Sequence, residues 1–227
     1  MTQVTVTLSK IHDRIAAAAG QAGRDPAEIR LIAVSKTKPP ELISAALDAG
    51  QRDFGENYLQ EATVKIQKLR DSGAVWHFIG RVQSNKTRDI ATEFDWVQTV
   101  DRQRIAQRLN DQRGQHQPPL NVCIQVRLSD DPARPGAAIT GIDQLAATIA
   151  AMPRLRLRGL MCMPPLETEA RLAAVHFERT RDLYETLRAA GHGLDTLSMG
   201  TSGDLEAAIA AGSTMVRIGT AVFGARA

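Results

Sequence analysis

The stretch Leu31-Ile32-Ala33-Val34-Ser35-Lys36-Thr37-Lys38-Pro39 decides the fold and contains the first candidate functional residue. Residues 31–35 are small or branched and mostly apolar, which is typical of a strand that is covered on both faces. Because side chains alternate along a strand, Lys36 is expected on the same side as Ile32 and Val34. The sequence therefore predicts a poorly solvated lysine amine where a buried strand ends.

A poorly solvated amine gives up its proton more readily, and an unprotonated lysine can condense with an aldehyde to form a Schiff base. Lys38 is the rival candidate, but Pro39 is expected to direct the chain into a helix and leave Lys38 nearer to solvent. Most lysines at strand ends are solvated or pair with a carboxylate. Position alone therefore does not assign a chemical role to Lys36.

An alternation of strands and helices surrounds this stretch. A leading amphipathic helix is expected from about Val6 to Ala22, and strands at 31–36, 53–57, 75–80, 96–100, 121–126, 157–163, 196–200 and 215–223. Helical patterns follow each of the first seven strands, including 39–49, 83–93, 142–151, 168–190 and 203–211. This order predicts an α/β fold, a (β/α)8 TIM barrel with an extra N-terminal helix, in one domain over residues 1–227. A doubly wound open sheet is the alternative.

Composition argues against several classes of function. The net charge is only +3 and aromatic residues make up 4%, so a nucleic-acid partner is not expected. The N-terminus lacks a secretory signal and no run of eighteen apolar residues occurs, so we expect a cytoplasmic protein without a membrane segment. Cys123 and Cys162 lie in apolar runs and are expected to be buried reduced thiols, with neither a disulfide nor a metal site.

Two loops near the end of the chain carry the residues that suit a phosphate group. In such a barrel, phosphate is commonly held after the seventh and eighth strands. The first loop reads Ser198-Met199-Gly200-Thr201-Ser202-Gly203-Asp204, and Gly219 with Thr220 forms the second. Glycines allow close backbone approach, hydroxyls donate, and a helix N-terminus follows. Ordinary helix capping would explain the hydroxyls without a ligand. Two such loops facing Lys36 nevertheless favour a phosphorylated carbonyl compound.

Arg217 lies inside the otherwise apolar run of the last strand. A charged arginine is seldom fully buried without a partner. In a structural role it would pair with Asp204 or Glu206. In a functional role it would point into the barrel mouth and donate to a ring nitrogen or to phosphate.

Five motifs, taken together, resemble a known family. They are Ala33-Val34-Ser35-Lys36, Phe54-Gly55-Glu56-Asn57, the run HFIGRVQSNK at 77–86, the run SMGTSGD at 198–204 and the run VRIGTAVFG at 216–224. In this order they resemble the YggS/PROSC family of pyridoxal 5′-phosphate (PLP) homeostasis proteins. The resemblance covers nearly the whole chain and implies a barrel like the N-terminal domain of alanine racemase.

The resemblance also implies a cofactor, PLP, and the residues that bind it. Lys36 would form the Schiff base, and Arg217 would lie beside the pyridine nitrogen. A permanent cation there disfavours protonation of that nitrogen, so the ring becomes a poorer electron sink. The loops at Gly200 and Gly219 would hold the phosphate. The full expected set is Lys36, Asn57, His77, Met199, Gly200, Thr201, Ser202, Arg217, Gly219 and Thr220.

Three positions depart from the pattern of this family. Val82 replaces a usual leucine, Arg127 stands where asparagine is frequent, and Arg134 takes the place of a common lysine. Arginine cannot form an imine, so an auxiliary lysine role in that loop is in doubt. No lysine follows Lys86.

The expected function is PLP homeostasis, in which the protein buffers the cofactor or delivers it to apo PLP-dependent enzymes without turnover of its own. Enzymes resembling alanine racemase continue into a β domain and use a tyrosine from a partner subunit as the second acid/base. Here the chain ends four residues after the last expected strand, and neither Tyr58 nor Tyr184 falls where that tyrosine would lie.

Two other functions stay open at this point. One is a PLP-dependent amino acid racemase or related enzyme with Lys36 as its sole base. The other is a phosphosugar isomerase or aldolase that uses Lys36 for a substrate imine. A monomer is expected, because no long apolar stripe is evident.

Overall fold

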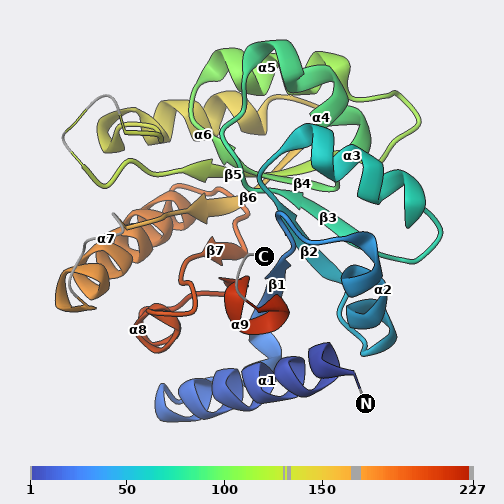
Figure 1. Ribbon diagram of the computed structural model, residues 1–227. Helices are drawn as coiled ribbons and strands as arrows, with labels where there is room; N and C mark the ends of the chain where they lie inside the picture. Colours follow the sequence, from blue (N-terminus) through green and yellow to red (C-terminus); the bar gives the residue numbers. More distant parts are fainter. Residues whose placement is uncertain (1, 130, 132–133, 165–169, 225–227) are drawn as a thin grey trace.

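The computed structural model describes residues 2–129, 131, 134–164 and 170–224, and a closed barrel of parallel strands forms its centre (Figure 1). Neighbours in the barrel follow the order of the chain, and β8 pairs with β1. The predicted (β/α)8 barrel is confirmed, and the doubly wound open sheet is ruled out. The strands are β1 (Arg30–Val34), β2 (Asp53–Glu56), β3 (Val75–Phe78), β4 (Trp96–Val100), β5 (Leu120–Gln125), β6 (Leu155–Met161), β7 (Thr196–Ser198) and β8 (Met215–Ile218).

Helices cover the outside of the barrel (Figure 1). Their buried apolar side chains form one core with the outward side chains of the strands, among them Leu31 and Ala33. The α-helices are α1 (Gln3–Gln21), α2 (Pro40–Asp48), α3 (Leu59–Lys68), α4 (Thr87–Glu93), α5 (Gln103–Gln112), α6 (Ile142–Ala150), α7 (Ala170–Ala189), α8 (Leu205–Ala210) and α9 (Thr220–Phe223). Short 3-10 turns are η1 (Pro26–Glu28), η2 (Ser84–Lys86) and η3 (Ile139–Gly141).

A second, smaller cluster fills the inside of the barrel. Ile32 of β1 is fully buried there, beside side chains from four other strands: Trp96, Cys123, Met161 and Met215. Ile32 thus points inward while Leu31 and Ala33 point outward, as expected for a strand with both faces covered. This alternation carries Val34, and then Lys36, to the mouth of the barrel.

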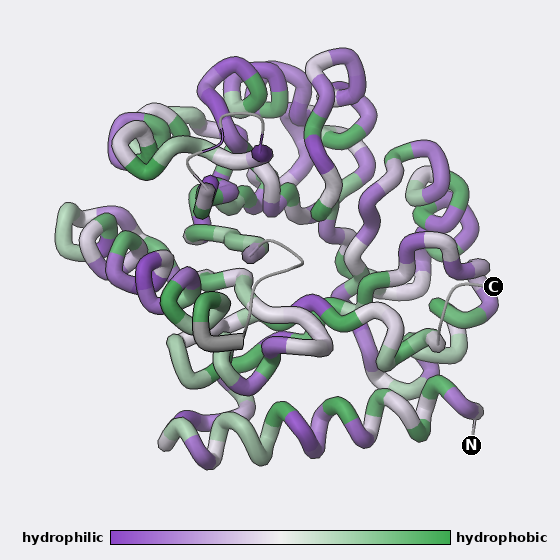
Figure 2. The backbone as a smooth tube through the Cα atoms, turned by 60° about the vertical axis from the view of Figure 1, so that its left-hand side comes forward, coloured by the Kyte–Doolittle hydropathy of each residue, from purple (hydrophilic) through white to green (hydrophobic). Residues whose placement is uncertain are grey.

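The expected N-terminal helix is present as α1, which lies along one side of the barrel beside α8 and α9 (Figures 1 and 2). Its buried positions include Val4, Leu8, Ile11 and Ile15, which recur at helical spacing. None of the helices described is long and apolar enough to cross a bilayer.

The prediction of one strand over residues 215–223 is wrong. β8 ends at Ile218, and Thr220–Phe223 forms the short helix α9. Gly219 leaves the extended conformation, and its carbonyl accepts the N–H groups of Val222 and Phe223 at 2.9 and 3.0 Å. Val222 and Phe223 are buried because α9 packs against α1, and their apolar character made this segment resemble a continuation of the strand.

Candidate functional site

A cavity of about 400 Å³ opens where the strands end. This volume lies within the usual range of small-molecule and cofactor sites. Its walls come from the carboxyl-terminal parts of β1 and β8 and from the segments that follow β1, β2, β3, β6, β7 and β8. The lining residues are Val34, Lys36, Thr37, Lys38, Asn57, Ile79, Met163, Thr201, Ser202, Arg217, Gly219, Thr220 and Gly224.

Seven of the ten residues predicted to bind the cofactor line this cavity, namely Lys36, Asn57, Thr201, Ser202, Arg217, Gly219 and Thr220. The structure therefore brings the lysine after β1 together with both glycine and hydroxyl loops, from opposite ends of the sequence. Tight packing supports the second loop, because a Cβ on Gly219 would lie 3.2 Å from the carbonyl oxygen of Val34.

Three predicted residues do not line the cavity. His77 is fully buried inside the barrel, and both of its ring nitrogens contact protein side chains. Met199 is fully buried in the core. Gly200 has a φ of +92°, and a Cβ there would lie 2.6 Å from the Cβ of Ala208. The side chains of His77 and Met199 therefore lie behind the cavity wall, and Gly200 shapes the backbone of the loop that carries Thr201 and Ser202.

The expected difference in exposure between Lys36 and Lys38 is not found. Both residues are half-buried and both line the cavity. Pro39 does not divert the chain at once, because a turn forms first: the N–H of Lys38 donates to the carbonyl of Ser35 at 3.0 Å. Thr37, within this turn, has a φ of 63°.

A buried ion cluster holds the residues on either side of Lys36. The ammonium of Lys65 donates to the carbonyl of Ser35 at 2.7 Å, to the Glu56 carboxylate at 2.8 Å and to the Glu61 carboxylate. Glu61 also accepts the N–H of Thr37 at 2.5 Å, and Ser35 Oγ donates to Glu56 at 2.6 Å. Residues 35 and 37 are thus tied to α3 and β2, so the backbone of Lys36 has little freedom.

Burying the carboxylate of Glu56 in this cluster carries a free-energy cost, because the charged form loses its contact with water. Burial raises its pKa, although the hydrogen bonds from Lys65 and Ser35 act in the opposite direction. Its second oxygen, Oε2, has no hydrogen-bond partner among the residues described. A buried carboxylate with one oxygen unsatisfied depends strongly on its cationic partner.

Arg217 is only 3% exposed. Two of its guanidinium nitrogens donate hydrogen bonds to protein oxygen atoms. Nη1 donates to Ser198 Oγ at 2.6 Å, and Nη2 donates to the carbonyl of Cys162 at 2.8 Å. Burial lowers the pKa of this guanidinium. The rest of the group faces the cavity, as the functional interpretation of this residue requires.

The carboxylates considered as partners of Arg217 are engaged elsewhere. Glu206 pairs with Arg14 of α1, with 2.5 Å between Oε1 and Nε. Asp204 accepts the N–H and the hydroxyl of Thr201 at 2.5 and 2.9 Å. Asp204 occupies the N-cap position of α8, but its side chain makes no capping hydrogen bond to that helix. Its carboxylate instead holds Thr201 beside the cavity.

Sequence reasoning missed several features of the site. Val34, Ile79 and Met163 supply apolar walls, and none of the three was among the predicted cofactor-binding residues. Gly80 allows the loops after β2 and β3 to touch, because a Cβ there would lie 2.1 Å from the carbonyl oxygen of Asn57. Gly80 and Gly219 lie inside two of the quoted motifs, and a glycine within a motif is the sequence signal for such close approach of backbone.

The remaining sequence predictions concern the cysteines, metal ligands and departures from the family pattern. Cys123 and Cys162 are buried and free, and burial raises the pKa of their thiols to about 12 and about 11. Within the described ranges, no group of three or more metal-ligating side chains occurs. Arg127 and Arg134 do not line the cavity, and Arg134 is exposed.

Known proteins are similar to this chain over nearly its whole length. The model of the alanine racemase N-terminal domain matches residues 6–227. The pyridoxal phosphate homeostasis protein of Escherichia coli is 53% identical, with 100% of this chain and 98% of that protein covered. The one from Pseudomonas aeruginosa is 54% identical, with 100% and 97% covered.

Solved structures agree with these matches. PipY of Synechococcus elongatus, with PLP bound, is 33% identical with a TM-score of 0.86, covering 98% of this chain and 100% of PipY. Alanine racemase of Corynebacterium glutamicum is 18% identical with a TM-score of 0.68, covering 96% of this chain and 61% of that one, which shows the shared barrel alone. The protein thus belongs to the family of pyridoxal phosphate homeostasis proteins, which is built on the alanine racemase N-terminal domain.

Proposed function

We propose that this protein binds PLP through Lys36 and serves PLP homeostasis, buffering the cofactor and delivering it to apoenzymes without turnover of its own. One observation carries the proposal: Lys36, the two phosphate-type loops and the buried Arg217 line a single cavity. The names of the relatives and the PLP-bound structure of PipY support the same function.

The chemistry of the cavity fits this cofactor. PLP is a phosphorylated aldehyde whose ring can accept electrons, and lysine amines condense with such aldehydes. Lys36 offers the amine. Hydroxyls at Ser202 and Thr220, with backbone at Gly219, offer donors for a phosphate, and Thr201 lines the same side of the cavity.

The protein's own groups would set how the bound ring behaves. The guanidinium of Arg217 stays charged near neutral pH, so it disfavours a second positive charge on a nearby ring nitrogen. The ion cluster around Lys65 holds the Lys36 turn in place. These residues bind and orient the cofactor while restricting its use as an electron sink.

The positions of the tyrosines favour a carrier over a racemase. Tyr184 is buried, and its hydroxyl donates to the carbonyl of Leu194 at 3.0 Å. Tyr58 is 57% exposed and lies in a neighbouring cavity with Arg81 and Lys86. In the part of the chain that the structure describes, no phenol lines the cavity of Lys36, so this chain does not itself place a second acid/base there.

The proposal is tested by loading the purified protein with PLP and measuring transfer and turnover separately. Incubation with an apo aminotransferase should restore aminotransferase activity. In deuterium oxide, the α-protons of a panel of amino acids should exchange no faster than with the same amount of free PLP.

Failure of wild-type protein to retain PLP on gel filtration would contradict the binding proposal. Rapid α-proton exchange that disappears in Lys36→Ala would favour the racemase alternative and contradict the carrier proposal.

A further inference from the structure

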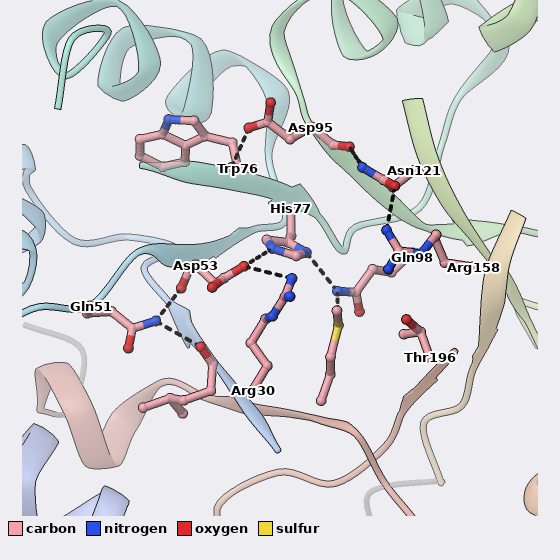
Figure 3. Close-up of polar contacts among 12 residues, drawn as sticks. Arg30, Gln51, Asp53, Trp76, His77, Asp95, Gln98, Asn121, Arg158 and Thr196 are labelled. Atoms are coloured by element: carbon pink, nitrogen blue, oxygen red, sulfur yellow. Dashed lines mark hydrogen bonds and ion pairs between the residues drawn. The ribbon is translucent and has the colours of Figure 1, made fainter. Parts of the chain in front are cut away.

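A chain of hydrogen bonds crosses the inside of the barrel from Arg217 to Asp53. Arg217 Nη1 lies 2.6 Å from Ser198 Oγ, which lies 2.6 Å from Gln98 Oε1. Gln98 Nε2 lies 3.0 Å from His77 Nδ1, and His77 Nε2 lies 2.9 Å from Asp53 Oδ1. Figure 3 shows the part from Asp53 to Gln98, with His77 between the two. We call Asp53, His77, Gln98 and Ser198 the Arg217 relay.

The donors in this relay all point the same way. Arg217 can only donate and the Asp53 carboxylate can only accept, so the two ends fix the order between them. Ser198 accepts from Arg217 and donates to Gln98. His77 then accepts at Nδ1 and carries its proton on Nε2. Burial lowers the pKa of His77 despite the opposing effect of Asp53, which agrees with a neutral ring.

This order stabilises the charge of Arg217. In the described residues its guanidinium hydrogen-bonds a hydroxyl and a carbonyl, and no carboxylate. Each neutral member of the relay turns its negative end toward Arg217 and its positive end toward Asp53. Side-chain dipoles aligned in this way act on the charges at both ends, because the barrel interior between them screens weakly. Asp53 is also 3.5 Å from Arg30 Nη1 at the far end.

We propose that Ser198, Gln98 and His77 are positioning residues that hold Arg217 as an oriented, charged donor against the bound cofactor ring. His77 thereby influences the ring without lining the cavity. The part that concerns the ring rests on the proposed function, whereas the order of hydrogen bonds is a property of the apoprotein. The two parts can therefore be tested separately.

The first test removes single hydrogen bonds of the Arg217 relay and measures the absorbance and affinity of bound PLP. Ser198→Ala and Gln98→Met should shift the visible absorbance of bound PLP and raise its dissociation constant about five- to tenfold, from the loss of one hydrogen bond to or near a charge. Ser198→Thr keeps a hydroxyl and should restore both values. Thr99→Val is the matched control, because Thr99 also lies on β4 and donates to the carbonyl of Gly80 at 2.6 Å, outside the relay.

Wild-type spectra and dissociation constants in both Ser198→Ala and Gln98→Met would overturn the effect on the ring. An equal shift in Thr99→Val would show a general response to lost buried hydrogen bonds and would also overturn it.

The second test uses nitrogen NMR of the apoprotein to determine which ring nitrogen of His77 carries the proton. His77 should carry its proton on Nε2 and keep Nδ1 bare, and Gln98→Met should change the Nδ1 resonance. A proton on Nδ1 at neutral pH would overturn the relay even if PLP binds normally. If the wild-type protein bound no PLP, the proposed function would fail while this measurement still decided the relay.

Discussion

At the scale of single residues, Arg217 and Lys36 differ in how firmly the protein holds them. Arg217 is nearly inaccessible and two of its nitrogens are fixed by oxygens. Lys36 is half-buried at the mouth, and its neighbours Ser35 and Thr37 are fixed instead. A rigid backbone with an accessible amine suits a residue that must form and release a bond with a ligand.

Arg217→Lys should weaken PLP binding about tenfold or more. Lysine keeps the positive charge, but its single nitrogen cannot contact both Ser198 and Cys162 while facing the cavity. Titration of the apoprotein with PLP measures the change. A wild-type dissociation constant in this variant would show that the pair of hydrogen bonds to Ser198 and Cys162 is unimportant for binding.

Acidification should destabilise the apoprotein through His77. Burial holds the folded pKa of His77 below its ordinary 6.5, with Asp53 acting in the opposite direction and Arg30 in the same one. Below pH 6.5 the unfolded chain therefore takes up a proton that the folded protein refuses. This stabilisation is complete above pH 6.5 and is lost as pH falls, by up to about 1.4 kcal/mol per pH unit.

Urea unfolding between pH 8 and pH 5 measures this slope. His77→Gln should flatten it, and His12→Gln, at an exposed position of α1, is the matched control. Equal slopes in wild type and His77→Gln would contradict a buried neutral imidazole.

The residues that give the cavity its chemistry could be predicted from the sequence, but the buried contacts that hold those residues in place could not. Lys36 and Arg217 stood out because charged residues in apolar runs are unusual. Lys65 gave no such signal, since a lysine within a helix is ordinarily solvated. Its burial depends on β2 placing Glu56 beside α3, a contact that exists only in the folded barrel.

At the scale of elements, α3 holds the Lys36 turn through Lys65. Lys65→Met should destabilise the apoprotein by about 3–5 kcal/mol, because Glu56 is left buried without its cation. Lys68→Met, at an exposed position of the same helix, should change stability by less than about 0.5 kcal/mol. Urea unfolding of the apoproteins gives both values.

The double variant Lys65→Met with Glu56→Gln should recover part of this loss, because the unpaired charge is gone. Equal stability of Lys65→Met and Lys68→Met would contradict the role assigned to the cluster.

Helix α1 supports the loop after β7. Arg14 Nη1 donates to the carbonyl of Ser202 at 2.9 Å while its other nitrogens pair with Glu206. We expect Arg14→Met to weaken PLP binding about two- to threefold, a small effect because the contact is partly exposed. Fluorescence titration measures it, with Lys10→Met on an exposed part of α1 as control. Unchanged binding would show that the loop keeps its shape without α1.

Element boundaries were harder to predict than element types. The alternation of apolar runs predicted every strand of the barrel, since each is buried on both faces. Val222 and Phe223 are also buried but belong to α9, because this short helix packs against α1 beyond the end of the barrel. Which partner buries a short apolar segment is decided by tertiary structure and cannot be known from its own pattern.

At the scale of the whole molecule, barrel closure joins the two ends of the chain. β1 pairs with β8, and α1 packs on α8 and α9. We therefore expect one domain, in which circular dichroism and tryptophan fluorescence of the apoprotein follow the same single unfolding transition. Sedimentation should give one monomer of about 24.6 kDa. Separate transitions or a stable dimer would contradict these expectations.

The most direct test of the central claim locates the lysine that holds PLP. The PLP-loaded protein is reduced with borohydride, digested, and mapped by mass spectrometry. The phosphopyridoxyl group should be found on Lys36, in the turn between Ser35 and Thr37 that the ion cluster fixes. Labelling of Lys38 in its place, or labelling that persists at full yield in Lys36→Ala, would contradict the account.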